Sequence, residues 1–356
     1  MPVVTSQPRQ VLVISLGGTI TMTAGADGGV TPALTAADLL SAVPGLADLD
    51  VEVRTEDFRR LPGASLSFDD LRALQAFVQE RFASGIHGVV VVQGTDTIEE
   101  TSYLLDLYHD GPQPIIVTGA MRGPTMAGAD GPANLLASVQ AAASAVTREL
   151  GCLVVFADEI HAARRVRKTH SAAGSTFQSP TGGPLGYLVE GQPRIVNHIV
   201  SRTIVPPPAQ AQPRVALLTM SLGDDGALMR GLAERVDGAV IAGFGVGHVP
   251  QHLVPALRDL ADHVPVVLAS RTGAGSVFTT TYGFPGSERD LLSHGLIPAG
   301  FLDPLKARIL LGTTLAVGAD RKTIAAAFGV AGGSTHPSDW PWAQRYELTE
   351  KEATRA

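Results

Sequence analysis

Short apolar runs alternate with longer amphipathic stretches along most of the chain, and this rhythm limits the possible folds more than any other feature. Residues 89–92 and 115–117 are almost continuously β-branched. Such runs are typical of parallel strands that helices bury on both faces. The pattern therefore predicts an α/β protein with a doubly wound, mostly parallel sheet.

The expected elements fall into two parts of the chain. The first part predicts strands at 11–16, 51–55, 88–93, 114–118 and 153–156 and helices at 35–42, 68–82, 98–108 and 132–146. The second part predicts strands at 215–219, 239–242 and 264–269 and helices at 226–234, 251–261, 304–311 and 321–328.

A proline-rich stretch separates these two parts. Pro206-Pro207-Pro208 and the alternating Ala and Gln residues after it favour an extended segment over packed structure. We expect a large N-terminal catalytic domain at 10–194, a linker at 195–213, a smaller C-terminal α/β domain at 214–335 and a tail at 336–356.

The composition excludes several classes of protein. Apolar residues make up 45% of the chain and charged residues 17%, which excludes a disordered or coiled-coil protein. The net charge of −7 argues against nucleic acid as a partner, because chains that bind polyanions carry a basic surface. The sequence shows neither a signal peptide nor a membrane span, and its single Cys152 lies in an apolar run, so we expect a cytoplasmic protein.

The residues that follow the predicted strands are the candidates for a site, because ligands of open parallel sheets bind beyond the carboxyl ends of the strands. Gly17-Gly18-Thr19 and Gly94-Thr95-Asp96 each place a threonine after glycine, which permits close approach of a ligand. A threonine hydroxyl is a poor nucleophile unless a base takes its proton. Lys168 is the candidate base, since an amine beside other cations and partly desolvated loses its proton more easily, and Asp96 could hold it.

Several of these features also have a purely structural interpretation. Thr97 and Glu100 match a capping box at the start of the helix at 98–108. Asp130 before Gly131-Pro132 matches a helix cap. The basic run at 164–168 is typical of a solvated face.

Motifs for metals and cofactors are missing from the sequence. The ten histidines contain no HExxH pair, and there is no GxxxxGK[ST], GxSxG or GxGxxG pattern. We therefore expect a reaction without metal or cofactor.

Two motifs together resemble the signatures of the bacterial-type L-asparaginase/glutaminase family. They are Leu16-Gly17-Gly18-Thr19-Ile20 and Gln93-Gly94-Thr95-Asp96-Thr97-Ile98-Glu99-Glu100-Thr101. The resemblance runs from about residue 10 to 330 and includes Thr118-Gly119-Ala120-Met121-Arg122, Ala129-Asp130-Gly131-Pro132-Ala133-Asn134-Leu135, Lys168-Thr169, Gly183-Pro184-Leu185-Gly186-Tyr187 and Asp303-Pro304-Leu305-Lys306-Ala307-Arg308.

The resemblance implies a threonine-dependent amidohydrolase without a cofactor. Thr19 is then the nucleophile on the side-chain amide of L-asparagine, while Thr95, Asp96 and Lys168 form a second catalytic triad. It further implies a homotetramer with the site at a dimer interface, where substrate contacts come from the residues Gly18, Gly94, Ala120, Ser65, His248 and Glu288.

The sequence departs from the family pattern in two places. The lid that follows Thr19 contains no tyrosine, and we take Tyr282, close to Glu288, as the candidate for the missing phenol. The family's Ser-Gln substrate contact falls at Gly63-Ala64, where Ser65 and Ser67 are candidate replacements.

Two other functions are consistent with parts of the sequence. A binding protein for an amino acid that has lost turnover would explain the absent lid tyrosine, and ammonia release separates it from a hydrolase. An asparaginase-like subunit of a transfer-RNA amidotransferase is disfavoured, because the chain begins at its first strand and is acidic.

Overall fold

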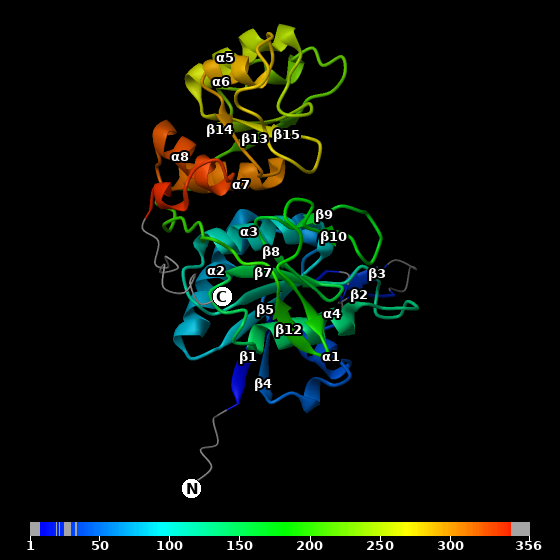
Figure 1. Cartoon of the computed structure of the whole chain (residues 1–356). Helices are drawn as coiled ribbons and strands as arrows, with labels where there is room; N and C mark the ends of the chain where they lie inside the picture. Colours follow the sequence, from blue (N-terminus) through cyan, green and yellow to red (C-terminus); the bar gives the residue numbers. More distant parts are fainter. Residues whose placement is uncertain (1–7, 19, 21, 25–29, 33, 343–356) are drawn as a thin grey trace. The chain divides into compact units, whose positions relative to one another are not determined.

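The computed structural model describes residues 8–18, 20, 22–24, 30–32 and 34–342 of the chain. They form two compact units, which divide between Ile199 and Val200 (Figure 1). No helix in this part of the chain is long and apolar enough to cross a bilayer.

The first unit is built on an eight-stranded sheet in the order β12-β11-β8-β7-β6-β5-β1-β4. Strands β4, β1, β5, β6 and β7 pair in parallel, and β8, β11 and β12 continue the sheet with antiparallel pairing. The strands are β1 (Arg9–Ser15), β4 (Val51–Asp57), β5 (Gly88–Val92), β6 (Ile115–Thr118), β7 (Cys152–Phe156), β8 (Glu159–Ala162), β11 (Gly186–Val189) and β12 (Gln192–Ile195).

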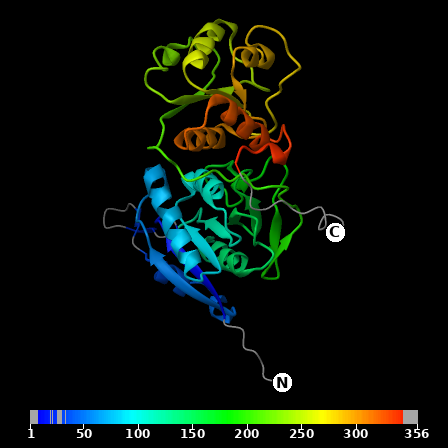
Figure 2. The ribbon, with the colours of Figure 1, turned by 90° about the vertical axis from the view of Figure 1, so that its left-hand side faces the viewer.

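Helices cover both faces of this sheet. Figures 1 and 2 both show α2 and α3 side by side on one face, and Figure 1 shows α1 and α4 on the other. The helices are α1 (Ala36–Ser41), α2 (Phe68–Ala83), α3 (Ile98–Tyr108) and α4 (Gly131–Ala143). The short 3₁₀ turns are η2 (Leu46–Asp48), η3 (Gly63–Ser65) and η4 (Thr95–Thr97). Two further pairs of short strands are β2 (Met22–Ala24) with β3 (Val30–Pro32) and β9 (Arg167–Lys168) with β10 (Phe177–Gln178).

The apolar runs form the core because both of their faces are covered. All of β5 is buried, and Val90 and Val92 pack in one cluster with Leu135 and Val139 of α4. Alternation along a strand turns Val89 and Val91 toward the opposite layer. The doubly wound, mostly parallel architecture expected from the sequence is thus confirmed.

The second unit is a smaller sheet of four parallel strands in the order β13-β14-β15-β16. Side chains of α5 and α6 pack in one apolar cluster with β14 and β15, and α7 packs against β13, β14 and β15. The elements are β13 (Val215–Thr219), η5 (Ala227–Met229), β14 (Gly238–Gly243), η6 (Gln251–Leu253), α5 (Val254–His263), β15 (Val266–Ser270), α6 (Glu288–Ser293), β16 (Ile297–Pro298), α7 (Pro304–Ala316), α8 (Arg321–Ala331) and η7 (Pro337–Asp339).

The predicted helix at 226–234 is wrong. Only η5 forms there, because Gly226 and Gly231 adopt left-handed backbone angles, with φ of 72° and 63°. A right-handed helix cannot continue through such residues.

The segment from 196 to 214 holds neither helix nor strand. Thr203 and Val205 within it are nonetheless buried, and Trp340 Nε1 donates to Ile204 O at 2.8 Å. The domain and linker boundaries expected from the sequence stay predictions.

Candidate active site

The order of strands in the large sheet predicts where a ligand binds. The chain passes from β1 to β4 on one side of β1 and returns with β5 on its other side. The crevice beyond the carboxyl ends of β1 and β5 is therefore the topological switch point of the sheet. Gly17-Gly18 follows β1 at this place, and Gly94-Thr95 follows β5.

Backbones of three loops touch directly at this switch point. Gly18 has φ of 95°, and a Cβ placed on it would lie 2.1 Å from Gly94 N. A Cβ on Gly63 would lie 2.8 Å from Gly94 O. Since neither position has room for a side chain, the loops after β1 and β5 and the η3 turn pack at a separation that only glycine allows.

Lys168 joins the two candidate side chains of the loop after β5. Its Nζ donates to Thr95 Oγ1 at 3.0 Å and to Asp96 Oδ1 at 2.9 Å. Thr95 is buried, and the Lys168 side chain is 15% exposed, whereas the Asp96 side chain is 64% exposed. The structure therefore brings together the three residues expected to form a triad, in a geometry that suits proton transfer between the amine and the hydroxyl.

The short β9–β10 pair holds the backbone of Lys168 in place. Lys168 pairs with Phe177 across this antiparallel ladder. The buried ring of Phe177 lies 4.8 Å from the ring of Phe156, at the end of β7. Lys168 is thus held to the core of the large sheet and does not lie on a freely solvated face.

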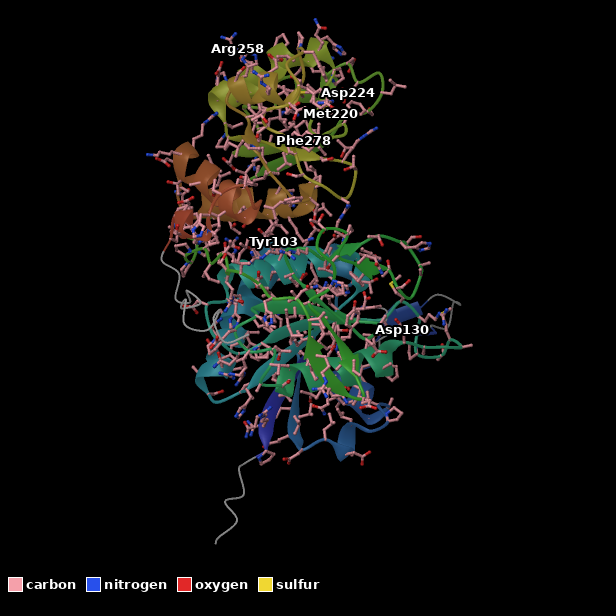
Figure 3. All side chains as sticks on the ribbon, viewed as in Figure 1. Tyr103, Asp130, Met220, Asp224, Arg258 and Phe278 are labelled. Carbon is pink, nitrogen blue, oxygen red and sulfur yellow. The ribbon has the colours of Figure 1, made fainter. Side chains whose placement is uncertain are left out.

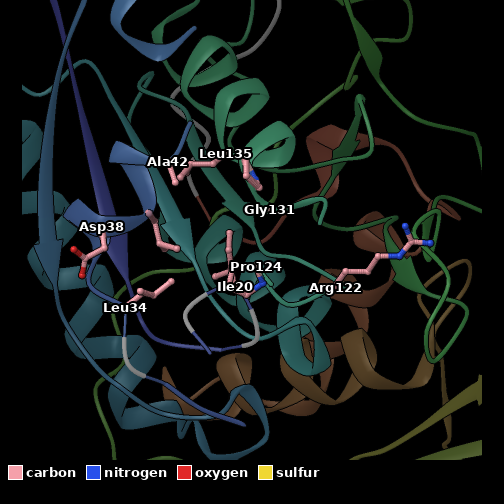
Figure 4. A pocket seen from close by; sticks show the side chains of 10 residues that line it. Ile20, Leu34, Asp38, Ala42, Arg122, Pro124, Gly131 and Leu135 are labelled. Carbon is pink, nitrogen blue, oxygen red and sulfur yellow. The ribbon is translucent and has the colours of Figure 1, made fainter. Parts of the chain in front are cut away.

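Thr19 lies outside the described residues, but both of its sequence neighbours are placed. Gly18 lies against Gly94, one residue before Thr95. Ile20 is buried, and a Cβ on Gly131 would lie 2.9 Å from Ile20 Cγ1 and 3.5 Å from the Cβ of Ala120. Figure 4 shows Ile20 in an apolar pocket with Leu135, while the guanidinium of Arg122 extends away from it.

The capping role expected for Thr97 is wrong. Thr97 is the residue before α3, but its side chain makes no capping bond. Thr97 Oγ1 instead donates to Gly63 O at 3.0 Å and accepts a hydrogen bond from Gln93 Nε2 at 3.1 Å. Thr97 therefore ties the loop after β5 to the η3 turn.

The two serines considered as substrate contacts have different surroundings. Ser67 begins α2, where its hydroxyl takes part in a capping box with Asp70. Ser65 is exposed in the η3 turn, next to Gly63. Of the two, Ser65 is the one whose hydroxyl is not committed to a helix cap.

The capping role expected for Asp130 is also wrong. Asp130 is the residue before α4, and Pro132 lies in the first turn as expected, yet the carboxylate accepts no capping bond from a backbone N–H of the helix. Its two oxygens accept the backbone N–H groups of Met121 and Arg122 at 3.0 and 2.9 Å. Asp130 therefore holds the loop that follows β6.

In the second unit, Glu288 is the centre of a separate polar cluster. Its carboxylate is fully buried and accepts the backbone N–H groups of Thr281 and Tyr282 at 3.0 and 2.6 Å, with His248 Nε2 at 3.2 Å. Burial alone would raise the pKa of Glu288, but these hydrogen bonds outweigh it and lower the pKa below its ordinary value. Glu288 is thus an anion at neutral pH.

Exposed aromatic rings surround this cluster. The ring of His248 lies 4.9 Å from that of Tyr282 and 5.0 Å from that of Phe284, both in edge-on contacts. Tyr282 is 42% exposed and Phe284 47% exposed. His248, Tyr282 and Glu288, singled out separately in the sequence, therefore form one group.

No set of three or more His, Cys, Asp or Glu side chains within the described residues is arranged to hold a metal ion.

The geometry agrees with the comparison to known families. One family model, described as "Asparaginase, N-terminal", matches residues 10–201, and another, "Glutaminase/Asparaginase C-terminal domain", matches residues 214–328. The chain belongs to the asparaginase family. The resemblance noted in the two sequence motifs is thereby confirmed.

Individual asparaginases are similar over almost the whole chain. A "Probable L-asparaginase" of Deinococcus radiodurans is 37% identical, across 91% of this chain and 98% of the relative. A "Glutaminase-asparaginase" of Pseudomonas aeruginosa is 33% identical, across 88% of each. The crystal structure of a "Probable Cytoplasmic L-asparaginase" from Campylobacter jejuni matches with a TM-score of 0.80 and 32% identity, across 90% of this chain and 99% of that one.

Sequence reasoning missed two features of the candidate site. It assigned Thr97 and Asp130 to caps from local spacing alone, although Thr97 binds the η3 turn, 34 positions earlier, and Asp130 binds backbone N–H groups of the loop after β6, 8 and 9 positions earlier. The missing information for Thr97 was the strand order, which brings the connections after β4 and β5 to the same edge of the sheet, whereas Asp130 folds back onto the β6–α4 connection that precedes it.

Proposed function

We propose that this chain hydrolyses the side-chain amide of L-asparagine to L-aspartate and ammonia. The observation that carries the proposal is the bridge from Lys168 Nζ to Thr95 Oγ1 and Asp96 Oδ1 at the switch point of an asparaginase-family sheet. Weaker activity on L-glutamine is expected, because one methylene contributes only about 1–3 kcal/mol of discrimination.

In the proposed mechanism, the Thr19 hydroxyl attacks the amide carbonyl. A bond forms between Thr19 Oγ1 and the carbonyl carbon as the hydroxyl gives up its proton, and the carbon–nitrogen bond breaks as the nitrogen takes up a proton and leaves as ammonia. Water then hydrolyses the ester, which releases L-aspartate and restores the hydroxyl. Lys168, held by Asp96, takes the proton from the Thr95 hydroxyl and returns it. Backbone N–H groups near Thr95 and Ala120 stabilise the oxyanion.

A coupled ammonia assay on L-asparagine, L-glutamine and their D-isomers tests this function. We expect release from L-asparagine to be fastest and to be abolished in Thr19→Ala. A wild-type protein that binds asparagine without releasing ammonia would instead be an amino-acid-binding protein.

We also propose that a second copy of the chain completes each site with Glu288, in a homotetramer that acts in the cytoplasm. Supporting this, the Glu288 carboxylate is charged, buried and bordered by the exposed rings of Tyr282 and Phe284. A buried anion of this kind suits the α-ammonium group of an amino acid. Tyr282 is then the candidate for the phenol missing from the lid, and Tyr282→Phe should slow turnover.

Mixing two impaired variants, assayed at an L-asparagine concentration below KM, tests whether the site is shared. Glu288→Gln subunits retain Lys168, and Lys168→Met subunits retain Glu288. Random pairing should restore about a quarter of the wild-type sites if the two residues act across an interface. No recovery after mixing and reassociation would mean that each copy builds its site alone.

A further inference from the structure

The loop after β6 lies against Thr95. A Cβ on Gly119 would lie 2.5 Å from Gln93 O and 3.4 Å from Thr95 Cγ2. The orientation of the peptide groups in this loop therefore decides which of them can face a substrate bound at Thr95.

Two side chains at the start of α4 fix this loop. Asp130, labelled in Figure 3, binds the N–H groups of Met121 and Arg122, one with each carboxylate oxygen. Asn134, one turn further along α4 and buried, donates from Nδ2 to Gly119 O at 3.1 Å and to Asp130 Oδ2 at 3.2 Å.

Asn134 is itself held by a third segment. Its Oδ1 accepts the backbone N–H of Ala157 at 2.9 Å, just after β7. Both donor hydrogens of the amide and one of its acceptor sites are thus in use, and this pattern leaves a single orientation for the side chain.

These contacts determine the direction of one N–H group. The C=O and N–H of a trans peptide point to opposite sides. Because Gly119 O points at Asn134, the Ala120 N–H points away from α4. It has no acceptor among the described residues, whereas the next two N–H groups are bound by Asp130.

We infer that Asp130 and Asn134 are positioning residues that orient the Ala120 N–H as a donor to the oxyanion. This inference rests on the proposed hydrolase function. A donor held in advance by buried hydrogen bonds needs no reorganisation when negative charge develops on the carbonyl oxygen.

The test is steady-state kinetics of Asn134→Asp and Asp130→Asn on L-asparagine. Asn134→Asp keeps the shape but turns a carboxylate toward Gly119 O and Asp130, so kcat should fall about 100-fold, the effect of losing one oxyanion donor. Asp130→Asn keeps one acceptor, so its kcat should fall about tenfold. KM should change by less than about threefold in both, since the contact forms only in the transition state.

Thr147→Val is the matched control. Thr147 follows the C-terminal end of α4, and its buried hydroxyl donates to Ala141 O, in the last turn of that helix, at 2.7 Å. It makes no hydrogen bond to the loop after β6. This variant should lower the melting temperature without lowering kcat. If wild type releases ammonia but folded Asn134→Asp keeps its kcat, or changes only KM, the inference is wrong while the proposed function stands. A wild type without turnover overturns both.

Discussion

Lys168 Nζ lies 3.0 Å from Thr95 Oγ1, although 73 positions in the chain separate the two residues. The β9–β10 pair holds the lysine, and the carboxyl end of β5 holds the threonine. Two independent parts of the fold thus place the amine and the hydroxyl at a distance that allows proton transfer.

Replacing Lys168 should abolish turnover without unfolding the protein. Lys168→Met removes the amine, and kcat for ammonia release should fall about 10³-fold, within the range of general acid–base effects. Lys168→Arg keeps the charge near Asp96 but cannot give up its proton. An active arginine variant would show that Lys168 acts only through its charge.

Gly18→Ala should disrupt the site, whereas Gly85→Ala should not. Both glycines have nearly the same φ, 95° and 98°, so both alanine variants carry backbone strain of about 1 kcal/mol. The new methyl group at Gly85 meets no described atom within 4 Å, but at Gly18 it meets Gly94 N at 2.1 Å. We expect kcat to fall about 100-fold in Gly18→Ala and to stay unchanged in Gly85→Ala. Equal kcat values in the two variants would contradict this account of the loop contact.

Glu288→Gln should weaken recognition of the α-ammonium group. KM for L-asparagine should rise about tenfold or more, because a charge-assisted contact is lost. Succinamic acid, which lacks the amino group, should be affected much less. The check is kcat/KM for L-asparagine divided by kcat/KM for succinamic acid. This ratio should be lower in Glu288→Gln than in wild type, and an unchanged ratio would exclude the contact.

The pH dependence of this recognition follows from the lowered pKa of Glu288. A carboxyl group with a folded pKa below 4.5 stays ionised above that pH. KM should therefore not rise through protonation of Glu288 until the pH falls below 4.5. A rise centred near pH 6 that disappears in Glu288→Gln would contradict the assignment.

His161 should make the fold sensitive to mild acid. Burial in β8 lowers the pKa of His161 to about 4, from an ordinary 6.5. Between these values the unfolded chain binds a proton that the folded chain does not, so the free energy of unfolding falls as the pH drops from 6.5 to 4. The loss is at most about 3 kcal/mol. Urea unfolding at pH 7 and pH 4.5 should show a smaller loss in His161→Gln than in wild type, and equal losses would be the contrary result.

Most of the parallel strands and helices could be predicted because their signals are local, although the short parallel strand β16 was not. The run at 89–92 is apolar on every residue, and the helix expected at 98–108 has the same bounds as α3. Similarly, the glycine and hydroxyl residues after the strand at 88–93 predicted the place of Thr95, and the basic run at 164–168 supplied Lys168 as the candidate base.

The antiparallel edge of the sheet gave no such signal. Strands β7 and β8 are joined by Ala157-Asp158, both with positive φ of 50° and 62°. Turns of this type usually contain glycine, and this one does not, so its residues do not predict a turn. The polar contacts of Thr97 and Asp130 were missed for a related reason: spacing along the chain predicts caps, whereas these side chains bind loop backbone whose path the spacing does not give.

The tight backbone contact among Gly18, Gly63 and Gly94 determines which residues near the site can be replaced in a directed-evolution experiment and which cannot. A library built to change which amide the protein prefers gains nothing from randomising these glycines, since almost every replacement would push the three loops apart. Ala64 and Ser65 are exposed and adjoin the same loops. Saturation mutagenesis at those two codons is where altered selectivity should be sought.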